Sequence, residues 1–148
     1  MSNTISSLIP ADTDAAYAVE CASHAFPWTH STFLSNQGER YYNLKLESQG
    51  QLAAFAITQV VLDEATLFNV AVAPAYQRQG LGRTLLQRLI DDLTERGVMT
   101  LWLEVRDSNR AAIALYHALG FSEVSLRRNY YPTADGREDA RIMALPLG

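Results

Sequence analysis

The spacing of apolar residues predicts a strand-rich chain whose two longest strands are neighbours. Apolar, β-rich runs at 52–61 and 65–72 are separated by a short turn containing Asp63 and Glu64, which predicts a hairpin. Shorter strands are predicted at 5–8, 42–47, 100–105, 123–128 and 140–145. The last two are expected to flank a loop marked by Pro132 and Asp135-Gly136.

Helical spacing predicts four helices among these strands. The strongest covers 80–96, where Leu81, Leu85, Leu89 and Leu93 fall four residues apart and Gly97 is placed to cap the end. Others are predicted at 12–24, at 31–36, and from the capping segment 107–109 to residue 119. The order of elements predicts a mixed α/β fold with helices packed on one central sheet.

Composition narrows the class of protein. The 148 residues suit a single domain, 1–148, and 48% hydrophobic with 19% charged residues is typical of globular proteins. No apolar run approaches the roughly 18 residues of a membrane span, so no membrane association is expected. The first residues lack a basic region followed by an apolar one, and the single Cys21 has no partner for an internal disulfide. A cytoplasmic location is therefore expected.

The net charge of −4 narrows the class of molecule that the protein is expected to bind. A protein that binds nucleic acid without regard to sequence needs a basic face, so direct nucleic-acid binding is not expected. An acidic chain is compatible with a basic protein or an amine as its partner.

The segment 77–83 lies between a predicted strand and the strongest helix and has the features of an anion site. The first amides of a helix lack internal partners, Gly80 and Gly82 allow close backbone approach, and Arg78 and Arg83 add positive charge. A nucleotide-binding P-loop would need a lysine before Thr84, and a dinucleotide fingerprint would need a small residue at position 85. A plain turn with solvated arginines is the remaining alternative.

The chain resembles the GNAT superfamily of N-acetyltransferases. Gln77, Gly80 and Gly82 match its pyrophosphate motif Gln/Arg-x-x-Gly-x-Gly/Ala, and 109–121 matches its second signature, Asn-x-x-Ala-x-x-Leu-Tyr-x-x-x-Gly-Phe. The strand 67–72 resembles the splayed GNAT strand whose backbone pairs with the pantetheine arm. Within the superfamily, the ribosomal-protein-alanine N-acetyltransferases are similar over nearly the whole chain, including the segments 25–28, 36–40, 63–69, 103–106 and 127–132.

This resemblance implies a fold, a co-substrate and a substrate. The fold would be a mixed sheet of about six to seven strands with about four flanking helices. The co-substrate would be acetyl-coenzyme A, with no metal, and the acceptor the N-terminal alanine of small-subunit ribosomal protein eighteen. Acetyl-coenzyme A would contact Val70, Ala71, Val72, Arg78, Gln79, Gly80, Leu81, Gly82, Arg83 and Asn109.

The resemblance also implies that Glu104 is the proton acceptor and Tyr116 the proton donor. Alternation along 100–105 puts Glu104 on the face opposite Leu103, where a structural ion pair with Arg106 is the competing interpretation. Because a glutamate near its ordinary pKa is a weak base, burial or a relaying water is expected to assist it. For Tyr116, packing of a buried ring is the competing interpretation.

Other assignments remain open at this point. Trp28, Tyr130 and Tyr131 are candidates for a peptide channel, although core packing accounts for two of them equally well. A GNAT enzyme acting on lysine or a small polyamine, and a catalytically silent coenzyme-A sensor, are the alternative functions. His24, His30 and His117 have no metal-ligand spacing, so structural or surface roles are expected.

Overall fold

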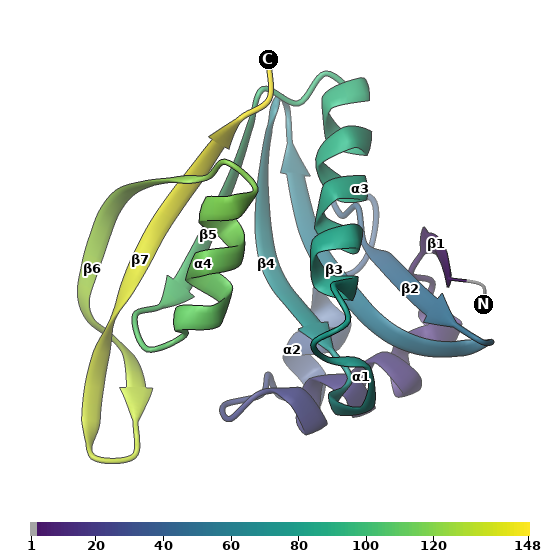
Figure 1. The fold of residues 1–148 in the computed structure, drawn as a ribbon, viewed down its shortest axis with the longest axis horizontal. Helices are drawn as coiled ribbons and strands as arrows, with labels where there is room; N and C mark the ends of the chain where they lie inside the picture. The colour runs from purple at the N-terminus through teal and green to yellow at the C-terminus, as the bar shows by residue number, and fades with distance from the viewer. Residues whose placement is uncertain (1–2) are drawn as a thin grey trace.

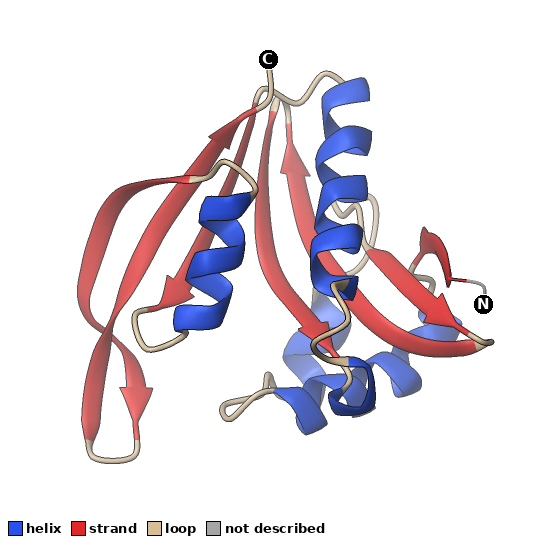
Figure 2. Ribbon diagram, viewed as in Figure 1, coloured by secondary structure: helices blue, strands red, loops and turns tan. Residues whose placement is uncertain are grey.

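The computed structural model describes residues 3–148 and contains one seven-stranded sheet with four α-helices (Figures 1 and 2). The strands lie in the order β1-β2-β3-β4-β5-β7-β6, and every neighbouring pair is antiparallel except β4 and β5. The α-helices are α1 Thr13–Ser23, α2 His30–Ser35, α3 Leu81–Glu95 and α4 Arg110–Ala118. The strands are β1 Asn3–Ser7, β2 Leu44–Ser48, β3 Gln51–Val61, β4 Glu64–Val72, β5 Thr100–Arg106, β6 Ser122–Thr133 and β7 Gly136–Pro146. The predicted fold class is confirmed, and two short 3-10 helices, Pro10–Asp12 and Pro74–Tyr76, are additional.

The central strand β3 separates two hydrophobic layers. Successive side chains of a strand point to opposite faces, and β3 is apolar on both. Ala54 and Ala56 pack in the cluster that contains the leucines of α3, whereas Phe55 and Ile57 pack in the cluster that contains Phe33 of α2. The sheet therefore lies between α3 and α4 in front and α1 and α2 behind (Figure 1).

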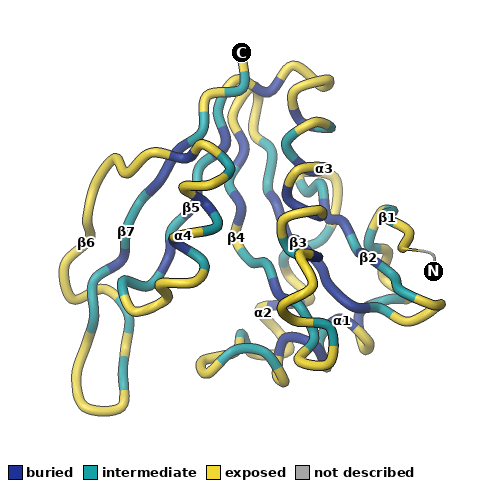
Figure 3. The backbone as a smooth tube through the Cα atoms, viewed as in Figure 1, coloured by how far each residue is buried: buried dark blue, intermediate teal, exposed yellow. Residues whose placement is uncertain are grey.

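The two faces of α3 are as predicted. Leu81, Leu85, Leu86, Leu89 and Leu93 are buried, and the polar face is exposed along the helix (Figure 3). Fully burying one such side chain contributes about 1.5–3 kcal/mol, so this stripe holds α3 on the sheet without strong capping.

A β-bulge in β4 opens the sheet. Ile57 pairs with Asn69 and Thr58 pairs with Leu67, so Phe68 has no partner on β3. Bulges bend a strand and re-aim its side chains. Parallel pairing between β4 and β5 ends at the same point, with Leu67 opposite Leu103, and β5 continues beside β7 alone. From Phe68 onward the two strands therefore diverge (Figure 1).

The C-terminal hairpin differs from the prediction. The loop expected between 128 and 140 is almost entirely strand, because β6 extends to Thr133 and β7 begins at Gly136. A register shift after Arg127 is stabilised by Asn129, whose backbone has φ 52° and whose N–H donates to Asp139 Oδ1 at 3.0 Å. Pro132 is tolerated because β6 is an edge strand, where no ladder hydrogen bond is required of it.

Candidate active site

A cleft of about 660 Å³ occupies the gap between the diverging strands. Its walls come from six parts of the chain: α1 and the segment after it, β4, β5, the β5–α4 loop, α4, and the β6–β7 hairpin. Six residues predicted for the site line it together: Trp28, Val70, Glu104, Asn109, Tyr116 and Tyr131.

Glu104 lies on β5 just beyond the last residue that pairs with β4. Leu103 and Val105 are buried on the opposite face, as the alternation predicted. The ion pair expected as the alternative is wrong: Arg106 pairs with Glu138 at 3.2 Å, while Glu104 Oε2 lies 3.0 Å from Nε of Arg127. The Glu104 side chain is 31% exposed, so the burial expected for it is only partial.

Tyr116 is buried in α4 and packs its ring against Phe121, with the centroids 5.7 Å apart. Tyr116 therefore both packs in the core and lines the cleft. Burial, with a smaller effect of Tyr131, raises the pKa of Tyr116 above its ordinary value of 10. Burial, aided by the charge of Glu104, also raises the pKa of Tyr131 to about 12, so the cleft contains two phenols that are protonated at neutral pH.

Asn109 caps α4, because its side-chain Oδ1 accepts a hydrogen bond from the Ala112 N–H at 3.2 Å. It also lines the cleft, so capping does not exclude contact with a ligand. Ala71 is buried in the cluster that contains Phe33 of α2, whereas Val70 and Val72 pack against the cluster that contains the leucines of α3. The Val72 carbonyl accepts hydrogen bonds from Ser23 Oγ at 3.0 Å and Gln77 Nε2 at 2.9 Å.

The loop 78–83 is placed at the end of β4 but does not line the cleft itself. Gly80 begins α3 in the left-handed conformation, with φ 78°, and a methyl group on Gly82 would lie 3.6 Å from Val72 Cγ2. Arg78 and Arg83 are exposed, and neither pairs with any of the acidic residues among 3–148. The helix start thus presents free amides and two uncompensated guanidinium groups to solvent.

Two aromatic side chains of the cleft wall, Phe26 and Tyr131, pack against Arg106. The guanidinium carbon lies 4.2 Å from the ring centroid of Phe26 and 4.4 Å from that of Tyr131. Tyr130 packs edge-on against Tyr131 and under Arg127, outside the cleft wall. Phe26 and Arg106 were not predicted for the site.

The cleft wall also includes Glu20, His24 and Asn69, which were not predicted for the site. The Glu20 side chain is 1% exposed; its Oε2 accepts from the Trp28 N–H at 2.8 Å and its Oε1 accepts from Asn69 Nδ2 at 2.8 Å. His24 Nε2 lies 3.1 Å from Asn69 Oδ1 and 3.4 Å from Glu20 Oε1. These contacts join α1, the segment after it and β4.

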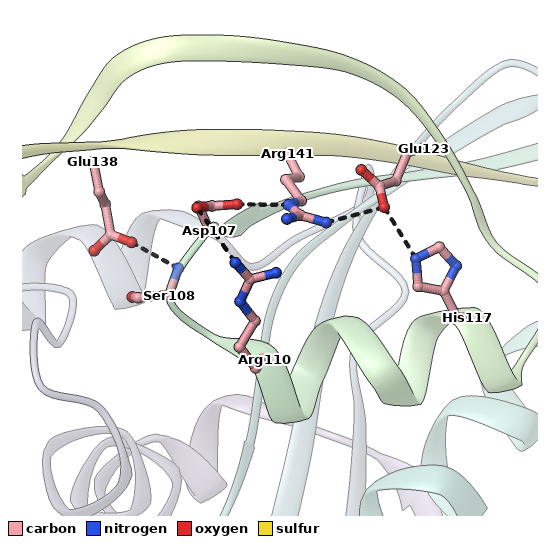
Figure 4. A network of polar contacts seen from close by, with 7 residues as sticks. All are labelled: Asp107, Ser108, Arg110, His117, Glu123, Glu138 and Arg141. Atoms are coloured by element: carbon pink, nitrogen blue, oxygen red, sulfur yellow. Dashed lines mark hydrogen bonds and ion pairs between the residues drawn. The ribbon is translucent and has the colours of Figure 1, made fainter.

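A polar network fixes the β5–α4 loop against the last hairpin (Figure 4). Arg141 Nε donates to Asp107 Oδ1 at 2.7 Å, and Arg141 Nη1 donates to Glu123 Oε2 at 3.0 Å. The Ser108 N–H donates to Glu138 Oε1 at 2.9 Å. Asp107 and Ser108, which directly precede Asn109 and α4, are therefore both held by side chains of β7.

Metal-binding side chains do not gather anywhere in residues 3–148. No group of three or more His, Cys, Asp or Glu side chains is arranged to hold a metal ion there. Nor is any described helix long and apolar enough to cross a membrane.

Comparison with known proteins identifies the family. Residues 6–121 match the model of the acetyltransferase (GNAT) family. The [Ribosomal protein bS18]-alanine N-acetyltransferase of Escherichia coli (strain K12) is 70% identical over 145 residues, which cover 98% of each chain. The crystal structure of the ribosomal-protein-S18-alanine N-acetyltransferase from Escherichia coli superimposes with a TM-score of 0.97, at 69% identity over 99% of this chain and 95% of that one. The structure of yncA from Salmonella typhimurium, solved with its cofactor acetyl-CoA, has a TM-score of 0.83 at 25% identity, over 100% of this chain and 95% of that one. The chain therefore belongs to the GNAT family of acetyltransferases.

Proposed function

We propose that this protein transfers the acetyl group of acetyl-coenzyme A to the α-amine of the N-terminal alanine of ribosomal protein bS18. The observation that carries the proposal is the 70% identity, over 98% of both chains, to an enzyme named for that reaction. The whole chain acts as one GNAT domain, since a single sheet contains every described strand. In the proposal the enzyme works in the cytoplasm, where ribosomal proteins are made. It binds neither membrane nor nucleic acid directly, in keeping with its net charge of −4.

The residues at the start of α3 fit the coenzyme. Its pyrophosphate carries negative charge, and the free amides of residues 79–83 with the exposed Arg78 and Arg83 supply donors and positive charge. The divergence of β4 from β5 leaves the backbone of Val70, Ala71 and Val72 without a partner strand on that side. In the proposal these backbone groups hold the pantetheine arm, one amide stabilises the oxyanion, and Asn109 contacts the coenzyme from the start of α4.

Glu104 accepts the proton that the amine loses as the nitrogen attacks the thioester carbonyl. The carboxylate lies where β4 and β5 separate, and its partial exposure leaves room for one relaying water. Arg127 must give up or share this carboxylate when the acceptor binds, because it holds one of the two oxygens at 3.0 Å.

Tyr116 donates a proton to the departing thiolate. Its raised pKa keeps the phenol protonated at neutral pH. The same burial makes an isolated phenolate costly, so the proton is transferred as the carbon–sulfur bond breaks rather than before. Trp28, Tyr130 and Tyr131 receive the peptide, with Trp28 and Tyr131 in the cleft wall and Tyr130 packed against Tyr131.

The test is intact-mass analysis of two peptides incubated with the protein and acetyl-coenzyme A. One peptide begins with a free alanine, and the other has a blocked N-terminus and a free lysine. We expect one acetyl group on the first and none on the second. At about pH 7 roughly a tenth of an α-amine is neutral, against about 0.04% of a lysine. Acetylation of the lysine peptide alone would replace the proposal with a side-chain enzyme, and no transfer despite coenzyme binding would indicate a sensor.

A further inference from the structure

The cluster of Glu20, His24 and Asn69 is not explained by the two proton transfers assigned above. Burying a carboxylate costs several kcal/mol unless it is paired and hydrogen-bonded, and Glu20 is 1% exposed. Among residues 3–148 the only side chain that can form an ion pair with it is His24, at 3.4 Å, and it does so only when the imidazole is protonated. All three side chains line the acceptor cleft.

The hydrogen bonds fix the tautomer of His24. Asn69 Nδ2 donates to Glu20 Oε1, so Asn69 Oδ1 faces the imidazole as an acceptor. The second neighbour of Nε2 is a carboxylate oxygen, which is also an acceptor. Nε2 therefore bears the hydrogen, and the lone pair of the neutral ring is on Nδ1. Nδ1 makes no hydrogen bond to any residue among 3–148, and the side chain is 31% exposed.

We propose that His24, held by Glu20 and Asn69, takes up the proton that the acceptor ammonium must lose before it can attack. This inference rests on the proposed function. The ammonium nitrogen gives its proton to Nδ1 and keeps the electron pair with which it attacks the thioester carbonyl. The proton that leaves the nitrogen during attack still goes to Glu104, so the two acceptors act in sequence.

The surroundings of His24 suit temporary storage of a proton. When Nδ1 is protonated, the imidazolium forms an ion pair with the Glu20 carboxylate, which has no other cation among residues 3–148. Because the ring is partly exposed, the proton can then pass to solvent and the neutral tautomer is restored. The other charged or titratable side chains of the cleft come from β5, α4 and the last hairpin: Glu104, Arg106, Tyr116, Tyr131 and Glu138.

The test uses His24→Asn and His24→Gln. The glutamine amide nitrogen lies as many bonds from Cβ as Nε2 and so retains an N–H donor for Asn69 and Glu20, whereas the asparagine amide is shorter; neither side chain takes up a proton near neutral pH. Without the acceptor only the neutral fraction of the peptide reacts, so kcat/KM for the alanine peptide should fall about tenfold at about pH 7. At about pH 9, where roughly nine-tenths of the amine is already neutral, the variants should approach the unmodified enzyme. Melting temperature and the Kd for acetyl-coenzyme A should not change.

His117→Asn is the matched control, because His117 is 47% exposed, pairs with Glu123 and does not line the cleft. It should leave kcat/KM unchanged at both pH values. A loss in the His24 variants of equal size at both pH values would overturn the inference and leave a purely structural cluster, as would no loss at either. If the unmodified enzyme fails to acetylate the alanine peptide at all, the proposed function itself is wrong.

Discussion

The anion-binding role of the loop before α3 can be tested at Gly80, where a side chain has two separable effects. The backbone has φ 78°, and a left-handed conformation costs an L-residue roughly 1–2 kcal/mol. A Cβ atom at this position would meet no atom within 4 Å, so crowding adds nothing in the free protein. Gly80→Val should therefore lower the free energy of unfolding by about 1–2 kcal/mol, or somewhat more because valine is β-branched.

The second effect concerns the coenzyme. If the amides at the start of α3 approach the pyrophosphate, a valine side chain displaces the ligand from at least one charge-assisted hydrogen bond. Such a bond contributes about 1.5–3 kcal/mol, and each 1.4 kcal/mol is a factor of ten in affinity. The Kd for acetyl-coenzyme A should therefore rise roughly ten- to a hundredfold.

Gly50→Val separates the two effects. Gly50 lies in the turn between β2 and β3 with φ 80°, and a Cβ atom there, as at Gly80, would meet no atom within 4 Å. The two variants should lose similar stability in thermal unfolding, while isothermal titration calorimetry should find weaker acetyl-coenzyme A binding only for Gly80→Val. Equal Kd values for the two variants would refute the assignment of the loop.

Three further predictions concern the chemistry and the scaffold. Glu104→Gln should lower kcat by about 10²–10⁴-fold with an unchanged Kd for acetyl-coenzyme A, and a normal rate in steady-state assays would remove Glu104 as the base. Tyr116→Phe should slow turnover with little change in melting temperature, whereas unfolding would favour a packing role alone. A hydrogen bond and ion pair from Arg141 hold the pKa of Asp107 below its ordinary value of 3.8. Asp107→Asn should therefore lower the free energy of unfolding in urea at about pH 6, because Arg141 stabilises only the ionised carboxylate. The difference between the variant and the unmodified protein should shrink as the pH falls below about 4 and the carboxylate becomes protonated.

The sequence predicts those parts of the fold where one face is buried. The leucines of α3 and the alternation in β5 both reflect contact with a core, so their periods are visible in the chain. The strand character of 129–139 in the β6–β7 hairpin escaped prediction because most of β6 is exposed on both faces and shows no alternation of burial. Its strands are specified instead by pairing, and by the contact of Asn129 with Asp139, ten residues away.

The site was predictable only in the motifs that resemble a known family, because its other residues meet through distant contacts. Asn69 and Glu20 are 49 residues apart, and Asn69 is re-aimed by a bulge at Phe68 that no local pattern reveals. The sequence of α1 nevertheless contains one indication of this polar cluster. Ala16 and Val19 define its buried stripe, and Glu20, four residues after Ala16, lies on that stripe rather than on the polar face. A carboxylate on an apolar stripe needs partners inside the fold, so the position of Glu20 already indicates a polar cluster that the helix alone cannot provide.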